Sequence, residues 1–441
     1  MARGWTAGLG AGLLVMAATQ ATAQESASPP SPSTASSTAF DRKAQQLVDV
    51  INDNIGYDAY FAPIFQAAVP ETQFKSMIAG IATQYGRALA IDAVNAPNGR
   101  SGSLRLRFEK GVATVLLDVG AAPDERVTGL RITGFVMEND SFARIAGELA
   151  TLPGSTGFLV AEIDGNRLVP QASAEADRQF AVGSTFKLYV LDELAAQIAA
   201  GRRKWDDVVP LSHPSFSSLA TANWPKNTPV TVQTLANWMI SVSDNGAADT
   251  LIHLLGRERI EARMRDAGHS APSRNVPFLT TVEAFALKGN NFAELREAYV
   301  KGNDAAQKKL LDNNENRLIL ANVDGVSFVE GPRFIDSLEW FASPNDIARL
   351  MVDLKDRASN QAMSSLSINN GLGVEAGERW SFLGYKGGSE NGVLSMSFLG
   401  QRKADSKWFV ITASWNNPAA NVDSVQMVGF MTRLLALTAK N

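Results

Sequence analysis

The spacing of apolar residues changes along the first third of the chain. Three segments carry apolar residues at helical spacing: residues 44–55, 57–65 and 72–85. Strand patterns follow, in which Leu104, Leu106 and Phe108 alternate with charged residues. Two further apolar runs are typical of strands: residues 112–119 and 127–136. Helices first and an antiparallel sheet afterwards predict a small α+β domain over residues 40–140.

A second set of elements begins after a short link. Residues 157–163 form an apolar strand pattern, and a largely helical stretch runs from residue 184 to 357. The end of the chain is a strand meander closed by an amphipathic helix: residues 380–386, 393–400, 408–415 and 422–440. We expect the first strand to pair with the last ones, so that a helical subdomain is inserted between strands of one antiparallel sheet. This predicts a second α+β domain over residues 150–441.

The N-terminal segment differs in composition from both predicted domains. Residues 1–23 contain Arg3, a short apolar run and the small-residue sequence Ala21-Thr22-Ala23, which are typical of a cleaved signal peptide. The apolar run is shorter than the ~20 residues of a spanning helix. Residues 24–39 are mostly Ser, Pro, Thr and Ala and predict a disordered linker. We therefore expect a periplasmic or secreted protein that does not insert into the membrane after cleavage.

Composition excludes several classes of function. A net charge of −4 gives no electrostatic basis for binding nucleic acid. The chain has no cysteine, which excludes disulfides, thiol catalysis and thiolate metal sites. Its three histidines, His213, His253 and His269, do not have metal-ligand spacing. We expect no metal and no organic cofactor. With three histidines, the chain offers few candidates for the histidine of a Ser-His-Asp triad.

The sequence Ser184-Thr185-Phe186-Lys187 has the spacing of a nucleophile and its base. Residues three apart lie on the same face of a helix, so Lys187 can reach Ser184 if the helix opens at the serine. The start of a helix also presents free backbone N–H groups to an oxyanion. A lysine base must be neutral, which requires its pKa to fall from ~10.4 through burial or a nearby cation.

Two further motifs follow Ser184 and Lys187 in the chain. Ser243-Asp244-Asn245 lies between two helical patterns, and Lys386-Gly387-Gly388 ends a predicted strand. Alone, the first is commonly a helix cap and the second a solvated hairpin charge. Together with Ser184 and Lys187 they match the order of S-x-x-K, S-D-N and K-T-G in β-lactamases and penicillin-binding proteins.

The chain resembles a known family at these motifs. Residues 157–440 look like a class A β-lactamase or penicillin-binding-type domain, and residues 180–187 are similar to its nucleophile segment. With the α+β domain in front, the whole chain resembles the two-domain β-lactamase-like hydrolases associated with clavulanic acid biosynthesis. The resemblance implies a β-lactamase/transpeptidase-like fold, an antiparallel sheet flanked by helices plus a helical subdomain.

The resemblance also implies a role for each motif residue. Ser184 attacks the carbonyl, Lys187 takes its proton, and Ser243 passes a proton to the leaving group. Asn245 orients Lys187 and substrate, while Lys386 binds a substrate carboxylate and supports the proton relay. The strand residues Gly388 and Ser389 contribute to substrate binding, and the backbone N–H groups of Ser184 and Ser389 form the oxyanion hole.

Two departures from the family pattern affect the expected activity. Gly387 stands where the K-T-G motif has a hydroxyl, so the carboxylate contact must weaken or pass to Ser389. The chain also has no Glu-x-x-Leu-Asn pentapeptide, whose glutamate activates the deacylating water in class A enzymes. Glu283, Glu330 and Glu339 are candidates for that base, although each is more simply a surface carboxylate.

The predicted reaction is acyl transfer through a Ser184 acyl-enzyme. Its substrate would be a small molecule, a carboxylate-bearing amide, lactam or ester, and β-lactam hydrolysis is the first choice by resemblance. A D,D-peptidase or esterase on the same scaffold is the alternative. A penicillin-recognising sensor that acylates without turnover is a third possibility from a different class.

Overall fold

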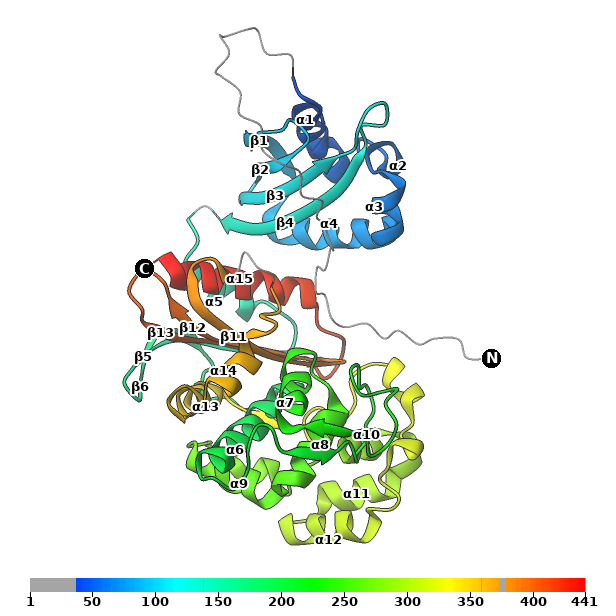
Figure 1. The fold of residues 1–441 in the computed structure, drawn as a ribbon, viewed down its shortest axis with the longest axis vertical. Helices are drawn as coiled ribbons and strands as arrows, with labels where there is room; N and C mark the ends of the chain where they lie inside the picture. Colours follow the sequence, from blue (N-terminus) through cyan, green and yellow to red (C-terminus); the bar gives the residue numbers. More distant parts are fainter. Residues whose placement is uncertain (1–36, 138, 358, 373–376, 441) are drawn as a thin grey trace. The chain divides into compact units, whose positions relative to one another are not determined.

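The computed structural model describes residues 37–137, 139–357, 359–372 and 377–440 (Figure 1). The predicted signal peptide and residues 24–36 of the predicted linker lie outside the described residues. The chain divides into two compact units. The first contains the chain up to Asp140 together with Val428–Ala436, and the second contains Ser141–Met427 together with the residues from Leu437 onward.

The first unit has helices followed by an antiparallel sheet, as predicted, and the sheet has four strands where three were expected. Its elements are α1 (Ala39–Ile51), α2 (Tyr57–Tyr60), α3 (Pro63–Ala68), α4 (Glu71–Tyr85), β1 (Ala88–Asn95), β2 (Ser101–Phe108), β3 (Gly111–Val119) and β4 (Val127–Met137), with strand order β1-β2-β3-β4. Thr38 and Asp41 form a capping box that starts α1. Strand β1 was not predicted, because most of its residues are exposed and only Ala88 is buried.

The second unit is built on a five-stranded antiparallel sheet. The strands are β5 (Ser155–Asp164), β6 (Arg167–Ala174), β11 (Trp380–Glu390), β12 (Val393–Arg402) and β13 (Trp408–Asn416), in the order β11-β12-β13-β5-β6. Strand β5 pairs antiparallel with β13 over its whole length. The expectation that the first strand pairs with the last ones is therefore confirmed, and β11 lies at an edge of the sheet.

The helices of the second unit lie mostly between β6 and β11 in the chain. They are α5 (Phe142–Ala150), α6 (Lys187–Ala199), α7 (Val232–Ser241), α8 (Asn245–Leu255), α9 (Arg257–Asp266), α10 (Thr281–Lys288), α11 (Ala293–Lys301), α12 (Asp304–Asn314), α13 (Pro344–Arg357) and α14 (Asn360–Ser367). Helix α15 (Ser424–Lys440) is divided between the units, because its residues Val428–Ala436 belong to the first. Two short strand pairs join them: β7 (Phe180–Ala181) with β10 (Phe341–Ala342), and β8 (Val208–Pro210) with β9 (Pro229–Thr231). The fold is α+β, with a helical subdomain inserted between the strands of the sheet.

Helix α6 is the centre of the helical subdomain. Leu188, Leu191 and Leu194 are completely buried, and the helix packs against α8, α9 and α13. The sequence predicted that this helix opens at Ser184. Instead, the 3₁₀ turn η1 (Gly183–Phe186) contains the serine, and the α-helix begins at Lys187. A 3₁₀ turn at the start of an α-helix is common because it satisfies free backbone groups with tighter bonds.

Four further 3₁₀ turns connect the helices: η2 (Pro272–Asn275), η3 (Asn290–Phe292), η4 (Leu320–Asn322) and η5 (Gly325–Val329). Within the described residues, none of the helices combines the length and the apolar character needed to cross a bilayer.

Candidate active site

The turn that contains Ser184 is held at both ends. The amide of Val182 donates to the carbonyl oxygen of Trp340 at 2.9 Å. The ring of Phe186 stacks on the indole of Trp340 with the ring centres 3.9 Å apart. Ser184 itself is only half-buried, whereas its neighbours Thr185 and Phe186 are buried. The nucleophile candidate is therefore fixed in place yet accessible to a small molecule.

Lys187 lies completely buried beneath Ser184. Its Nζ is 3.1 Å from Ser184 Oγ and 2.6 Å from both the carbonyl oxygen of Ser243 and Oδ1 of Asn245. Burial lowers the pKa of Lys187 to about 7, while the negative charges of Asp244 and Asp249 oppose this shift. A large fraction of Lys187 is then neutral near neutral pH, as a base for Ser184 requires.

The loop between α7 and α8 delivers Ser243 and Asn245 to Lys187. Ser243 adopts a left-handed backbone conformation with φ of 58°, which turns the chain sharply before α8. Asn245 accepts from Lys187 with Oδ1 and donates with Nδ2 to the carbonyl oxygen of Phe216 at 2.7 Å. The amide is thus oriented by two partners, which fixes its oxygen toward the lysine.

Asp244 is a structural residue of this loop. Its carboxylate caps α8 by accepting from the amide of Ala247 at 2.8 Å. It also accepts from the amides of Ala220 and Thr221 at 2.7 and 2.9 Å and from Thr221 Oγ1 at 2.7 Å. A single buried carboxylate therefore joins the start of α8 to the segment at Ala220 and Thr221, which lies before β9 and α7 in the chain.

Lys386 reaches the same serine from β11. Its Nζ is 2.9 Å from Ser243 Oγ and donates to the carbonyl oxygen of Gly387. The Nζ of Lys187 is 3.3 Å from the same Ser243 Oγ. Burial, with Lys187 nearby, lowers the pKa of Lys386 well below its ordinary value. The hydroxyl of Ser243 therefore lies between two lysines, a geometry that suits proton transfer.

Gly388 lets β11 approach the nucleophile closely. A Cβ atom at this position would lie 2.1 Å from the carbonyl oxygen of Val182 and 2.5 Å from the amide nitrogen of Ser184. A Cβ at Gly183 would lie 3.2 Å from the amide nitrogen of Ser389. The structure thus brings the backbones of Ser184 and Ser389 together, as an oxyanion hole made by their two N–H groups requires.

The three glutamates proposed as deacylation bases are engaged elsewhere. Glu283 belongs to the capping box of α10 and accepts from Arg257 at 2.7 Å. Glu330 is exposed and lies 3.9 Å from Arg333. Glu339 is buried in an ion pair with Lys288. Among the described residues, no hydrogen bond joins any of these carboxylates to Ser184 or Lys187.

A fourth carboxylate, which the sequence did not bring to notice, lies directly after Ser389. Glu390 shares Lys288 with Glu339, and its Oε1 is 2.6 Å from Lys288 Nζ. Burial and the charge of Glu339 raise the pKa of Glu390 well above its ordinary value, while Lys288 opposes the shift. Only strand register places Glu390 here, so no sequence motif could have indicated it.

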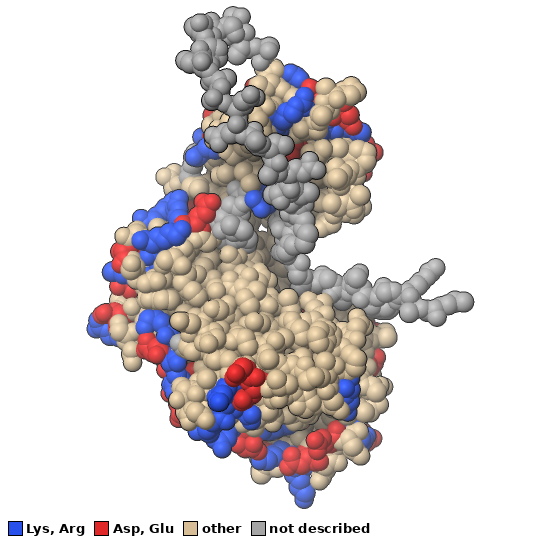
Figure 2. Space-filling view, in the orientation of Figure 1, with Lys and Arg blue, Asp and Glu red and all other residues tan. Residues whose placement is uncertain are grey.

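Aromatic side chains adjoin the catalytic loop. Phe216, whose carbonyl oxygen accepts from Asn245, packs with Phe285 and Phe328 at ring-centre distances of 5.2 and 5.6 Å. Leu219 and Val242 are exposed on neighbouring loop segments. Figure 2 shows charged side chains mostly at the margins of the larger unit, while the area in front of α7 and β11 is largely uncharged. The described surroundings of the candidate site therefore carry few charged side chains and include several aromatic ones.

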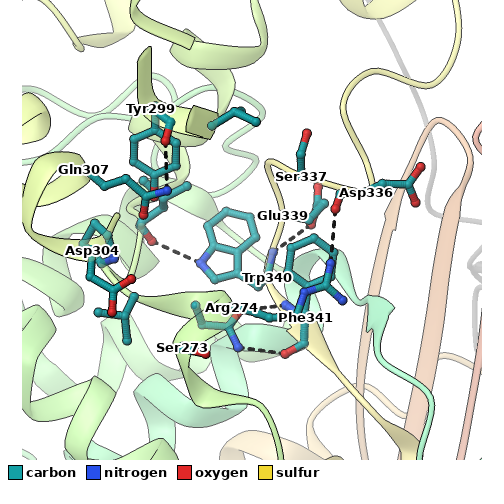
Figure 3. A pocket seen from close by; sticks show the side chains of 15 residues that line it. Ser273, Arg274, Tyr299, Asp304, Gln307, Asp336, Ser337, Glu339, Trp340 and Phe341 are labelled. Atoms are coloured by element: carbon teal, nitrogen blue, oxygen red, sulfur yellow. Dashed lines mark hydrogen bonds between the residues drawn. The ribbon is translucent and has the colours of Figure 1, made fainter. Parts of the chain in front are cut away.

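A cavity of about 260 Å³ lies apart from these residues (Figure 3). It is lined by Arg274, Tyr299, Asp304, Glu339 and Trp340 among others, and by none of the residues Ser184, Lys187, Ser243 and Lys386. Its polar groups are largely paired with one another: Arg274 donates to the carbonyl oxygen of Asp336 and Trp340 to that of Leu279. No cluster of metal-ligating side chains occurs in the part of the chain that the structure describes.

Comparison with known proteins gives one family. Residues 141–370 match the model of the β-lactamase enzyme family. Solved structures similar to the chain include a β-lactamase from Sphaerobacter thermophilus (20% identity, 68% of this chain and 95% of that chain, TM-score 0.46). A β-lactamase from Chitinophaga pinensis is 13% identical, with 68% of this chain and 97% of that chain covered and a TM-score of 0.45. PBP-A is 14% identical, with 68% of this chain and 95% of that chain covered and a TM-score of 0.45. No curated protein matches the chain.

Proposed function

The chain belongs to the β-lactamase enzyme family of serine hydrolases, and we propose that it works by acyl transfer through Ser184. The proposed substrates are small carboxylate-bearing lactams, amides or esters, with β-lactams as the first class. One observation carries the proposal: Lys187 Nζ, buried and with a pKa of about 7, lies 3.1 Å from Ser184 Oγ. A neutral lysine at hydrogen-bond distance is a competent base for a serine hydroxyl.

In the acylation step, neutral Lys187 takes the proton of Ser184 while Oγ forms a bond to the substrate carbonyl carbon. The N–H groups of Ser184 and Ser389 stabilise the oxyanion. When the carbonyl carbon–nitrogen bond breaks, Ser243 Oγ donates a proton to the leaving nitrogen and is reprotonated from the lysine ammonium. The contacts of Ser243 with both Lys187 and Lys386 support this relay.

Deacylation needs a water molecule and a second base. The contacts of Glu283 and Glu339 support a slow second step, because both carboxylates are held by cations away from Ser184. This favours a second candidate function, a penicillin-recognising protein that is acylated and releases its adduct slowly. Rapid mixing with a chromogenic lactam separates the two: sustained turnover after the burst indicates a hydrolase, and a burst alone indicates a sensor.

Aromatic side chains bear on the substrate. Phe285 and Phe328 pack against Phe216, whose carbonyl oxygen accepts from Asn245, and such an aromatic cluster suits a substrate with an apolar or aromatic acyl group. A panel of a lactam, a D-Ala-D-Ala peptide and a simple ester, each with an aromatic and a methyl acyl group, tests this. We expect higher kcat/KM for the aromatic member of the preferred pair. Equal values would contradict an apolar acyl site.

We also propose that the mature protein is periplasmic or secreted, from the signal-like residues 1–23. N-terminal sequencing of the exported form should begin near Gln24. A protein that keeps Met1 in the cytoplasm would contradict this proposal.

A further inference from the structure

One buried lysine holds two segments that lie on either side of the nucleophile turn. Lys288 is the last residue of α10, and its Nζ lies 2.6 Å from Oε1 of Glu390 and also contacts Oε1 of Glu339. Glu390 is the last residue of β11, whereas Glu339 belongs to the segment before β10. A single ammonium group therefore joins three parts of the chain that are distant in sequence.

The charges of this cluster are unequal. Burial opposes the positive charge of Lys288, but the two carboxylates outweigh this effect and raise its pKa, so the ammonium group remains charged. Two carboxylates thus share one cation, although only 17% of the Glu390 side chain and 1% of the Glu339 side chain are exposed. A second buried carboxylate costs desolvation free energy and is not needed to neutralise one lysine. The pairing with Glu390 therefore indicates a role beyond charge balance.

Glu390 lies on the face of β11 that carries the site. Residues two apart on a strand share a face, so Lys386, Gly388 and Glu390 project to the same side. On this side, a Cβ at Gly388 would lie 2.5 Å from the amide nitrogen of Ser184. Within the described residues, the only strand neighbour of β11 is β12. The ion pair with Lys288 thus holds the end of this edge strand from the side of the nucleophile.

Glu339 connects the nucleophile turn to the same lysine. It directly precedes Trp340, whose carbonyl oxygen accepts from the amide of Val182 at 2.9 Å. The indole of Trp340 also stacks on Phe186, the last residue of η1. The cluster around Lys288 therefore links the turn of the nucleophile to the end of β11.

We propose that Lys288, through Glu339 and Glu390, positions the two N–H groups of the oxyanion hole relative to each other. The proposal rests on the acyl-transfer function proposed above. Lys288 and Glu390 are then positioning residues, because neither forms a hydrogen bond with Ser184 among the described residues. Ser389 directly precedes Glu390, so a shift of that carboxylate moves the N–H donor of Ser389. An oxyanion donor acts at about 2.7–3.1 Å from the developing charge, and a displacement of about 1 Å can cost ~10²-fold in rate.

Glu390→Ala removes the link to β11 and leaves the remaining charges matched. Lys288 and Glu339 stay as a neutral pair, so folding does not require a buried unpaired charge. With a chromogenic penicillin, the acylation rate constant at saturation should fall about tenfold to a hundredfold, because a displaced N–H donor stabilises the oxyanion less. The dissociation constant of the initial non-covalent complex should change less than about threefold, since that complex carries no oxyanion. Both constants are properties of the folded molecules and do not depend on the yield of folded protein.

Two further variants complete the experiment. Glu390→Gln keeps an oxygen that can accept from Lys288, so its rate constant at saturation should stay within about threefold of the wild-type value. Arg402→Met is the matched control, because it removes a buried ion pair with Asp405 at the end of β12 that lies away from Glu390. It should lower the free energy of unfolding and leave both kinetic constants unchanged.

Three results would overturn the proposal even if Ser184 is acylated. They are an unchanged rate constant at saturation in Glu390→Ala, an equal loss in Arg402→Met, and a Glu390→Gln variant as slow as Glu390→Ala. If the wild-type protein is not acylated at Ser184, the proposed function itself is wrong and this inference falls with it.

Discussion

Two buried lysines meet at the hydroxyl of Ser243, and their environments decide what each can do. Lys187 contacts Ser184 and has a pKa of about 7. Lys386 does not contact Ser184 in the described hydrogen bonds and reaches Ser243 instead. Desolvation is the largest cause of the lowered pKa in both cases. Only Lys187 is therefore placed to act directly on the nucleophile.

The first prediction concerns the pH dependence of acylation. A protonated Lys187 cannot accept the Ser184 proton, so acylation by a fluorescent penicillin should be slow below pH 7, rise through a midpoint near 7 and level off above it. Lys187→Ala should lower the rate by at least ~10²-fold above pH 7, where the lysine is mostly neutral. A midpoint near ~10, the value of an unperturbed lysine, would contradict the burial argument.

The sequence predicted some of these contacts and could not predict others. The three-residue spacing of Ser184 and Lys187 sets their distance locally, whatever the rest of the chain does. The approach of Ser243 and Lys386 could be inferred from motif order alone. Glu390 was missed because its position depends on strand register and on packing against distant residues.

At the level of elements, the loop before α8 depends on one carboxylate, which gives the second prediction. Asp244→Ala removes a helix cap and three further hydrogen bonds to the segment at Ala220 and Thr221. We expect a loss of about 3 kcal/mol in the free energy of unfolding, together with slower acylation because Asn245 shifts. Denaturant titration and labelling rates measure the two effects.

The matched control is another helix cap far from the site. Asn303 caps α12 through the amide of Ala306 at 3.0 Å. Asn303→Ala should cost about 1 kcal/mol and leave acylation unchanged. Equal losses of stability for both variants, with normal acylation, would show that Asp244 is an ordinary cap.

The third prediction concerns the contact between β11 and η1. Gly388→Ala places a methyl group against backbone atoms of Val182 and Ser184, so one of the two segments must move. Displacing an oxyanion donor typically costs ~10²–10³-fold in rate, and we expect a loss of this size in acylation. Gly147→Ala on α5, where a Cβ meets nothing within 4 Å, should instead add about 0.5–1 kcal/mol of stability and keep full activity. Full activity of Gly388→Ala would contradict the proposed oxyanion hole.

Element prediction from periodicity succeeded where one face of an element is buried. The last two strands of the C-terminal meander were predicted close to their observed bounds, since their residues are almost all buried. The first was predicted to end at residue 386 and extends to Glu390. Strand β1 lacks such a face, and α5 is a short helix in a stretch interpreted as a link. The 3₁₀ turn at Ser184 was also missed, because α and 3₁₀ turns share the same local sequence preferences.

At the level of the whole molecule, the arrangement of the sheet follows from pairing that is distant in sequence. Strand β5 pairs with β13, and the proposed catalytic residues all lie between these two strands in the chain, with Lys386 contributed by β11 at the sheet edge. The sequence pattern led us to expect that the first strand pairs with the last ones, whereas the full order of the five strands was not predicted. The position of a deacylation base depends on the same long-range packing. For this reason the sequence could not show that Glu283, Glu330 and Glu339 form their contacts away from Ser184.

The most direct test of the central claim is a time-resolved mass spectrum after mixing the protein with a penicillin. The acyl-transfer account predicts a covalent adduct on the peptide that contains Ser184, formed within the mixing time and persisting for many seconds because no described carboxylate contacts the nucleophile or its lysine. Ser184→Ala should show no adduct. An adduct that survives in Ser184→Ala, or no adduct and no lactam loss in the wild-type protein, would contradict the account.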